Sequence, residues 1–105
     1  MNSKKVSPNH LSYLKLIEDG YYAEKTEYHT RGRTHDLFGF GDLIGLRKSE
    51  ILLVQATSAS NVSARIKKIT EHPNVGVVRD AGIRILVWGW RMRDGQWICR
   101  EIDLS

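Results

Sequence analysis

Hydrophobic and polar residues alternate along this chain in short runs typical of strands, and a helical period occurs twice. Apolar positions three and four residues apart predict amphipathic helices, whereas runs rich in Val, Ile, Leu and aromatic residues bounded by turn residues predict strands. The predicted helices are 8–19 and 61–71, and the predicted strands are 21–28, 38–47, 50–58, 82–92 and 96–104. This order, helix, three strands, helix, two strands, favours an α+β (mixed α/β) domain in which helices flank a central mixed sheet.

Residues that favour capping mark the ends of the two helices. Ser7 can cap the first helix, and Gly20 follows its last turn. Ser60 is expected to cap the second helix in the same way. The polar segment 29–36 predicts a basic loop, and residues 72–82 break the helical pattern but leave room for a short helical turn.

The strands 38–47 and 50–58 are separated by two residues, which predicts a tight hairpin. If those two residues form the loop, Arg47 pairs with Glu50 and Asp42 lies directly opposite Gln55. Paired residues on antiparallel strands point to the same face of the sheet. Because Lys-Ser is not a preferred two-residue hairpin turn, a slipped register stays open.

A second hairpin is predicted by the Asp-Gly pair at residues 94–95, one of the strongest short turn signals. In that register Met92 pairs with Trp97, and Trp90 pairs with Cys99. Apolar pairs of this kind predict that the three tryptophans pack in the core, because rings that stack on single-stranded nucleic acid must be exposed along a groove.

Length and composition indicate one domain over residues 1–105, with residues 1–6 expected to be a flexible N-terminus. The formal net charge of +4 favours polyanionic partners without requiring them. A single cysteine excludes an intramolecular disulfide. The first ten residues hold no apolar signal segment, and no stretch approaches the ~20 apolar residues of a membrane span. A soluble cytoplasmic protein without membrane attachment is therefore expected.

Asp42 and Gln55 are the first candidates for functional residues. The Asp42 carboxylate lies within one apolar run and is expected to face the Gln55 amide in the following apolar run. Thr57 shares a face with Gln55. A carboxylate and an amide carbonyl are the hard oxygen ligands that Mg²⁺ or Mn²⁺ prefers. Two other interpretations stay open: Asp42 can face water or pair with Arg47, and the amide can be satisfied by backbone groups.

These residues resemble the PD-(D/E)xK nuclease superfamily, in particular small Holliday-junction-resolvase-like and phage-type proteins. The resemblance rests on the order of elements, an acid in the second strand and a Gln-x-Thr at the end of the third. It implies a restriction-endonuclease-like fold and a Mg²⁺ or Mn²⁺ ion held by Asp42 and Gln55, where Gln also occurs in Mrr-type restriction nucleases. Glu18 in the first helix matches the acidic residue that such enzymes often add.

Thr57 departs from the family pattern because it stands where the motif lysine should be. A threonine hydroxyl can position water but has no basicity near neutral pH. Either another basic residue replaces the lysine, with Lys25 the first candidate and Lys67 or Arg65 the next, or the chain binds nucleic acid without cleaving it.

Basic residues before Asp42 and on the second helix are expected to flank the site and hold phosphates. They are Arg31, Arg33, Arg65, Lys67 and Lys68. An ordinary solvated basic face is the alternative. The resemblance implies DNA, possibly branched, as the partner and a homodimer as the assembly. The function expected from the sequence is a Mg²⁺-dependent DNA endonuclease with a degenerate site, and the alternative is an inactive nucleic-acid-binding or regulatory module.

Overall fold

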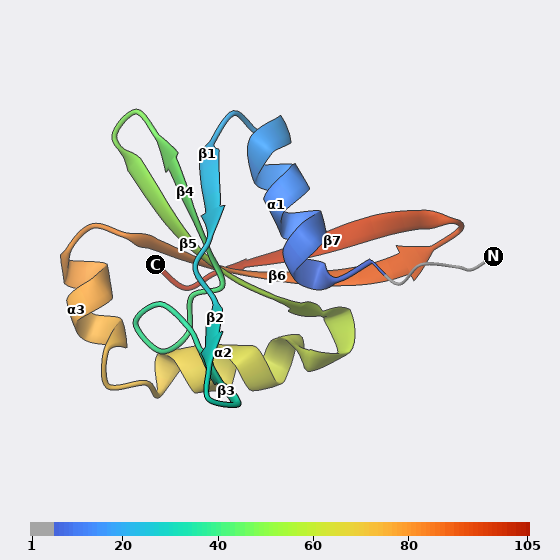
Figure 1. Ribbon diagram of the computed structural model, residues 1–105. Coiled ribbons are helices and arrows are strands. Elements are labelled where there is room, and N and C mark those ends of the chain that lie inside the picture. Colours follow the sequence, from blue (N-terminus) through green and yellow to red (C-terminus); the bar gives the residue numbers. More distant parts are fainter. Residues whose placement is uncertain (1–5) are drawn as a thin grey trace.

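The computed structural model describes residues 6–105, which form a five-stranded sheet with helices on both faces (Figure 1). Residues 1–5, most of the segment predicted to be flexible, lie outside the described residues. The elements are α1 (Pro8–Glu18), β1 (Tyr22–Lys25), β2 (Tyr28–Thr30), β3 (Arg33–His35), β4 (Leu43–Arg47), β5 (Glu50–Ser58), the 3₁₀ turn η1 (Ala59–Asn61), α2 (Val62–Thr70), α3 (Val75–Asp80), β6 (Arg84–Arg93) and β7 (Gln96–Asp103).

The strand order of the main sheet is β1-β4-β5-β6-β7, and β2 pairs with β3 in a separate two-stranded sheet. The pair β5 and β6 is parallel and is connected through α2 and α3, whereas the other neighbours in the main sheet are antiparallel. The predicted α+β domain with a mixed sheet flanked by helices is confirmed. None of the helices in residues 6–105 is long and apolar enough to cross a membrane.

Each face of the sheet has its own hydrophobic core. Leu16 of α1 packs against Leu52 and Trp88 on one face. On the other face, α2 and α3 cover Leu53 and the alternate positions of β6. Because successive strand residues point to opposite faces, Gln55 and Thr57 lie on the same face as Leu53, the face that α2 covers.

Three of the predicted elements differ substantially from the structure, whereas the bounds of the other predicted helices and strands agree to within two residues. The predicted strand 21–28 is divided into β1 and β2, and the predicted basic loop 29–36 forms most of the β2–β3 hairpin. The predicted strand 38–47 begins only at Leu43, because Phe38 (φ 58°) and Gly39 (φ 94°) turn the chain into a compact loop. Beyond Lys25, β1 therefore has no strand partner, and the chain leaves the sheet.

The β4–β5 hairpin has the predicted register, with Arg47 opposite Glu50. Lys48 adopts a left-handed conformation (φ 48°), which a non-glycine residue rarely takes. Contacts beside the turn hold it in place: the Glu50 carboxylate accepts hydrogen bonds from Arg47 at 2.9 Å and from the Tyr21 hydroxyl at 2.7 Å. Arg47 also donates to the Asp19 carbonyl oxygen at 2.7 Å, which ties the hairpin to the end of α1.

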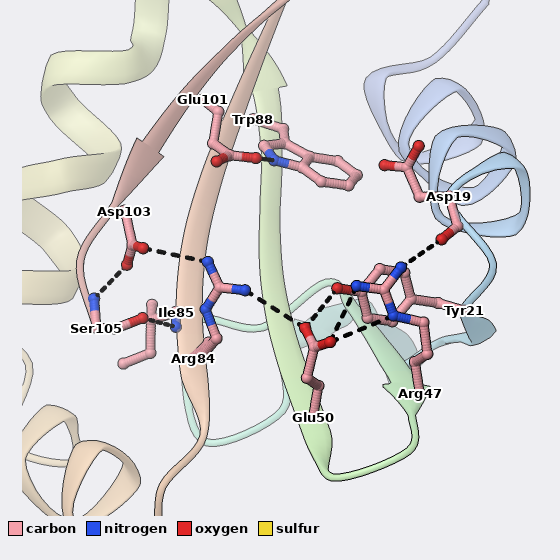
Figure 2. Close-up of polar contacts among 10 residues, drawn as sticks. All are labelled: Asp19, Tyr21, Arg47, Glu50, Arg84, Ile85, Trp88, Glu101, Asp103 and Ser105. Atoms are coloured by element: carbon pink, nitrogen blue, oxygen red, sulfur yellow. Dashed lines mark hydrogen bonds and ion pairs between the residues drawn. The ribbon is translucent and has the colours of Figure 1, made fainter.

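The same polar network continues across the sheet, as Figure 2 shows. Arg84 of β6 lies 3.5 Å from Glu50 and 3.3 Å from Asp103 of β7. Exposed ion pairs contribute only ~0–1 kcal/mol each, so their main effect is to fix how the strands align at this end of the sheet.

The β6–β7 hairpin also has its predicted register, with Met92 opposite Trp97 and Trp90 opposite Cys99. Core packing is confirmed for two tryptophans, since Trp88 and Trp90 are buried. It is wrong for Trp97, which is 40% exposed because the end of this hairpin extends past α1 and lacks a covering helix.

The predicted cap of α2 is wrong. Residues 59–61 form the 3₁₀ turn η1 ahead of the helix, so the helix begins at Val62. The Ser60 hydroxyl instead lies 3.2 Å from the Ser58 hydroxyl. The short helical turn expected within residues 72–82 is confirmed as α3.

Gly41 and Gly76 provide a test of the packing beside β5. A Cβ on Gly41 would lie 2.3 Å from Leu53 Cδ1, and Leu53 is only 1% exposed. We expect Gly41→Ala to lower the free energy of unfolding by ~1–3 kcal/mol through overpacking. Gly76→Ala on α3 meets nothing within 4 Å and should raise that free energy by ~0.5–1 kcal/mol. Urea denaturation measures both, and shifts of the same sign would contradict the packing described.

Candidate functional site

Asp42 and Gln55 meet at the end of the β4–β5 pair, as the hairpin register requires. The Gln55 Nε2 atom donates to Asp42 Oδ2 at 2.5 Å, and the Ala56 backbone N–H donates to the same oxygen at 2.9 Å. Both side chains are 3% exposed. The Gln55 Oε1 atom is buried and has no hydrogen-bond partner among the described residues. A buried carbonyl oxygen without a partner costs free energy unless it binds something.

A compact loop brings Asp36 to the same place. The backbone groups of Leu37 and Gly41 hydrogen-bond to each other at 2.9 and 2.8 Å, which closes the loop. Asp36 directly precedes Leu37, and Asp42 directly follows Gly41. The pairing of Leu37 with Gly41 therefore places the two aspartates opposite each other. The Asp36 Oδ1 atom is also buried and without a partner in the described part of the chain.

Glu27 reaches the site from the end of β1. The Thr26 backbone N–H donates to the Asp42 carbonyl oxygen at 2.8 Å, so the chain after β1 passes beside Asp42. Asn9, in the first turn of α1, donates from Nδ2 to Glu27 Oε1 at 3.2 Å. The start of α1 thereby orients this carboxylate.

The three carboxylates form a compact group of oxygen atoms. One oxygen each from Glu27, Asp36 and Asp42 lies within 4.8 Å of the other two. All three line a cavity of about 360 Å³, together with Gln55 and Thr57. The first residues of α1, the turn η1 and the start of α2 also line this open cavity. The cavity therefore presents several hard oxygen atoms to any small cation or polar ligand that enters.

Burial raises the pKa of Asp42 from its ordinary value of 3.8 to about 7. The negative charges of Asp36 and Glu27 add to the rise, while the hydrogen bonds from the Ala56 N–H and from Gln55 oppose it. A carboxyl group with such a pKa holds a proton under mildly acidic conditions and gives it up readily to a competing cation.

Two basic side chains of α2 reach this acidic group. Lys68 Nζ lies 3.2 Å from Asp36 Oδ2, and the Asp36 side chain is 14% exposed. Arg65, one turn earlier on the helix, lines the cavity. A positive charge next to the carboxylates partly compensates their mutual repulsion.

The other residues that the sequence offered for catalysis occupy different positions. Thr57 is buried and lines the cavity. Lys25 does not reach it: opposite Leu43, it lies on the α1 face of the sheet, with its ammonium 6.0 Å from the centre of the Tyr13 ring. Glu18 lines a separate groove between α1 and the β6–β7 hairpin.

The remaining predicted basic residues are exposed. Arg31 and Arg33 belong to the β2–β3 hairpin, whose two ends are continuous with Glu27 and Asp36. Lys67 lies on α2 next to Lys68, and no ion pair to it is found in the described residues.

Sequence reasoning missed Glu27 and Asp36 as members of the site. Both are the acidic residues that border the polar segment 28–35. Glu27 was placed in the predicted strand 21–28 and Asp36 in the predicted basic loop 29–36, so the two ends of this segment were not expected to meet. Once it is a hairpin, the antiparallel pairing of Tyr28 with His35 brings the flanking acids together.

No protein-family model matches this chain, and no curated protein matches it.

The pKa of Asp42 predicts how stability depends on pH in a metal-free solution. In the unfolded chain this carboxyl ionises near 3.8, whereas in the folded protein it keeps its proton until about pH 7. The folded state therefore binds more protons between these values, and the free energy of unfolding should fall as pH rises through this interval. Asp42→Asn has no carboxyl group to ionise at this position, so its free energy of unfolding should not fall for this reason. At pH 8 that free energy should exceed the wild-type value by up to ~4 kcal/mol.

Urea denaturation in EDTA at pH 4.5, 6 and 8 measures the effect. Asp80→Asn, which removes an exposed carboxylate on α3, is the control for the loss of a carboxylate outside the site. A constant difference between Asp42→Asn and wild type over the same range would contradict the assignment.

Proposed function

We propose that this protein is a metal-dependent nuclease that hydrolyses phosphodiester bonds of DNA. The observation that carries the proposal is the unpartnered Gln55 Oε1 atom, buried in the same cavity as three carboxylates. An acidic cluster alone is common at protein surfaces. A buried amide oxygen without a partner, on a residue that lines the same cavity as such a cluster, points to a ligand with positive charge.

The arrangement of the strands supports a restriction-endonuclease-like fold as part of this proposal. The antiparallel strands β1, β4 and β5 are followed by α2 and by β6, which runs parallel to β5. Asp42 directly precedes the second of these strands, and Gln55 lies on the third. This is the order of elements and motif residues that the resemblance to PD-(D/E)xK nucleases implies.

Mg²⁺ or Mn²⁺ fits the donor atoms of this cavity. The residues that would hold the ion are Asp42 and Gln55, as the sequence suggests, with Glu27 and Asp36 added by the fold. All offer oxygen, the ligand that these ions prefer. When bound, such an ion polarises a phosphoryl oxygen and lowers the pKa of water.

The side chains of this chain supply the remaining requirements for hydrolysis. Lys68 and Arg65 carry positive charge at the cavity and can neutralise the phosphate. The Thr57 hydroxyl can orient a water molecule but cannot take up its proton near neutral pH. We therefore assign to Lys68, and not to Lys25, the place of the motif lysine that Thr57 vacates.

A non-catalytic DNA-binding module is the second candidate, and one observation favours it. Lys68 is paired with Asp36, so the ammonium group assigned to the place of the motif lysine is already engaged by a carboxylate. If that pair persists when DNA binds, the charges attract phosphate without assisting cleavage.

Metal binding provides the first test. Calorimetric titration with Mn²⁺ at pH 8 should detect binding to wild type and an affinity at least tenfold lower in Asp42→Asn and Gln55→Ala. Glu18→Gln is the control, because it removes a carboxylate from the separate groove beside α1. Equal binding by wild type and Asp42→Asn would remove Asp42 from the site.

Two neighbouring lysines of α2 give the test of cleavage. With Mn²⁺ and either linear or four-way-junction DNA, Lys68→Ala should reduce the cleavage rate by ~10²-fold, because the charge beside the cavity is lost. Lys67→Ala removes the same charge from the adjacent exposed position and should change the rate by no more than ~3-fold. Gel electrophoresis of labelled DNA measures both rates. If wild type binds DNA but cuts none of these substrates, the binding module replaces the enzyme.

A further inference from the structure

Residues 28–35 form a hairpin that rises directly from the candidate site. This segment, here called the basic arm, follows Glu27 and precedes Asp36, so both of its ends are at the acidic cavity. It contains two arginines and two histidines and no acidic residue. Its side chains are almost all exposed; Tyr28, for example, is 56% exposed.

The basic arm has a defined shape of its own. Tyr28 pairs with His35, and Thr30 pairs with Arg33, across a turn in which Arg31 (φ 48°) and Gly32 (φ 76°) are left-handed. The Tyr28 and His35 rings are stacked with centroids 4.8 Å apart.

Both histidines are also held by threonine hydroxyls. Thr30 Oγ1 lies 2.7 Å from His35 Nε2, and Thr34 Oγ1 lies 3.0 Å from His29 Nδ1. These contacts occupy the histidines and threonines, so the two arginines remain as the charged groups that the arm presents outward.

We infer that the basic arm docks into the major groove of B-form duplex DNA, next to the phosphate held at the cavity. This inference rests on the proposed function and specifies its substrate. The charge of the arm complements the DNA backbone, and the major groove, ~12 Å wide and ~8.5 Å deep, admits a two-stranded ribbon. Strands of three residues extend ~10 Å at ~3.3 Å per residue, enough to reach the floor of the groove.

The geometry also excludes other nucleic acids as the preferred partner. The major groove of A-form RNA is too narrow for side chains to enter, and a single strand has no groove. A ribbon that projects from the edge of the cavity and is stabilised by its own cross-strand contacts suits a rigid groove. The substrate is thus duplex DNA, including the duplex arms of a branched molecule.

The β6–β7 hairpin supplies a matched control within the same chain. Its turn, Asp94 (φ 51°) and Gly95 (φ 78°), has nearly the same conformation as the turn of the basic arm. Arg91 and Arg93 precede that turn and are exposed. In Figure 1 this hairpin projects to the far right, whereas the basic arm (β2–β3) projects downward.

The experiment measures DNA affinity by fluorescence anisotropy in EDTA, where cleavage cannot interfere. The double variant Arg31→Gln with Arg33→Gln should bind a DNA duplex ~10-fold or more weakly than wild type, with a log–log salt slope smaller by ~2. Arg91→Gln with Arg93→Gln should stay within ~2-fold of wild type. Circular dichroism and the Mn²⁺ titration verify that the variants are folded.

A second measurement locates the arm on the DNA. Wild type should protect guanine N7, a major-groove atom, from methylation, and the arm variant should lose that protection. Wild-type affinity for an RNA duplex of the same sequence should be at least ~10-fold lower. Unchanged affinity in the arm variant, protection that persists in it, or equal binding to the RNA duplex would each overturn the inference.

The outcomes separate this inference from the proposed function. If guanine N7 is protected only when the arm is intact, and the protein never cleaves DNA, the inference is supported and the proposal of a nuclease is refuted. Metal-dependent cleavage with unchanged affinity in the arm variant refutes the inference and leaves the nuclease standing.

Discussion

The register between β4 and β5 is the constraint on which the site depends. Because side chains alternate along a strand, a slip by one residue would turn Gln55 to the opposite face from Asp42. The Lys-Ser turn is a poor determinant of register, and interactions at both ends of the hairpin replace it. Glu50 accepts hydrogen bonds from Arg47 and Tyr21 at the turn, and the Asp42 carboxylate accepts two hydrogen bonds at the other end. The second set is formed by the residues of the site itself, so the same atoms hold the fold and shape the cavity.

Burying Asp42 beside two partly exposed carboxylates opposes folding, and the rest of the molecule must offset that cost. The pKa of Asp42 rises because its carboxyl group is buried and because two other carboxylates are near. Hydrophobic cores on both faces of the sheet stabilise the fold and offset the repulsion between these carboxylates. Lys68 reduces the repulsion by its contact with Asp36. Sites that break the usual rules of polar burial in this way are commonly functional, since the free energy spent on them is recovered when a ligand binds.

Much of this arrangement follows from sequence alone, and the exceptions have physical causes. The two hairpin registers, the pairing of Asp42 with Gln55 and the alternation of faces are local consequences of strand geometry, so they could be predicted. Glu27 and Asp36 could not, because Glu27 meets Asp36 only through the β2–β3 hairpin. Asp36 in turn meets Asp42 only through the turn at Phe38 and Gly39, where a non-glycine residue takes a positive φ that no pattern indicates. The choice of Lys68 over Lys25 depends on which face of the sheet each strand residue occupies, and β1 was predicted to be longer than it is. Trp97 is exposed for a related reason, since pairing within a hairpin does not reveal where the covering helix ends.

The segment between β1 and β4 combines two opposite charges in one short insertion. Its ends, Glu27 and Asp36, are acidic and converge at the cavity, while its tip carries arginines about one strand length (~10 Å) away. At that separation exposed charges are largely screened from each other at physiological ionic strength, so the basic tip does not neutralise the acidic base. Under the proposed function, each would attract a different ligand: a cation at the cavity and a polyanion at the tip. Because the free carboxylates would repel a phosphate, a cation bound in the cavity would favour the approach of a polyanion to the cavity, whereas the arginines at the tip could meet the polyanion without the cation.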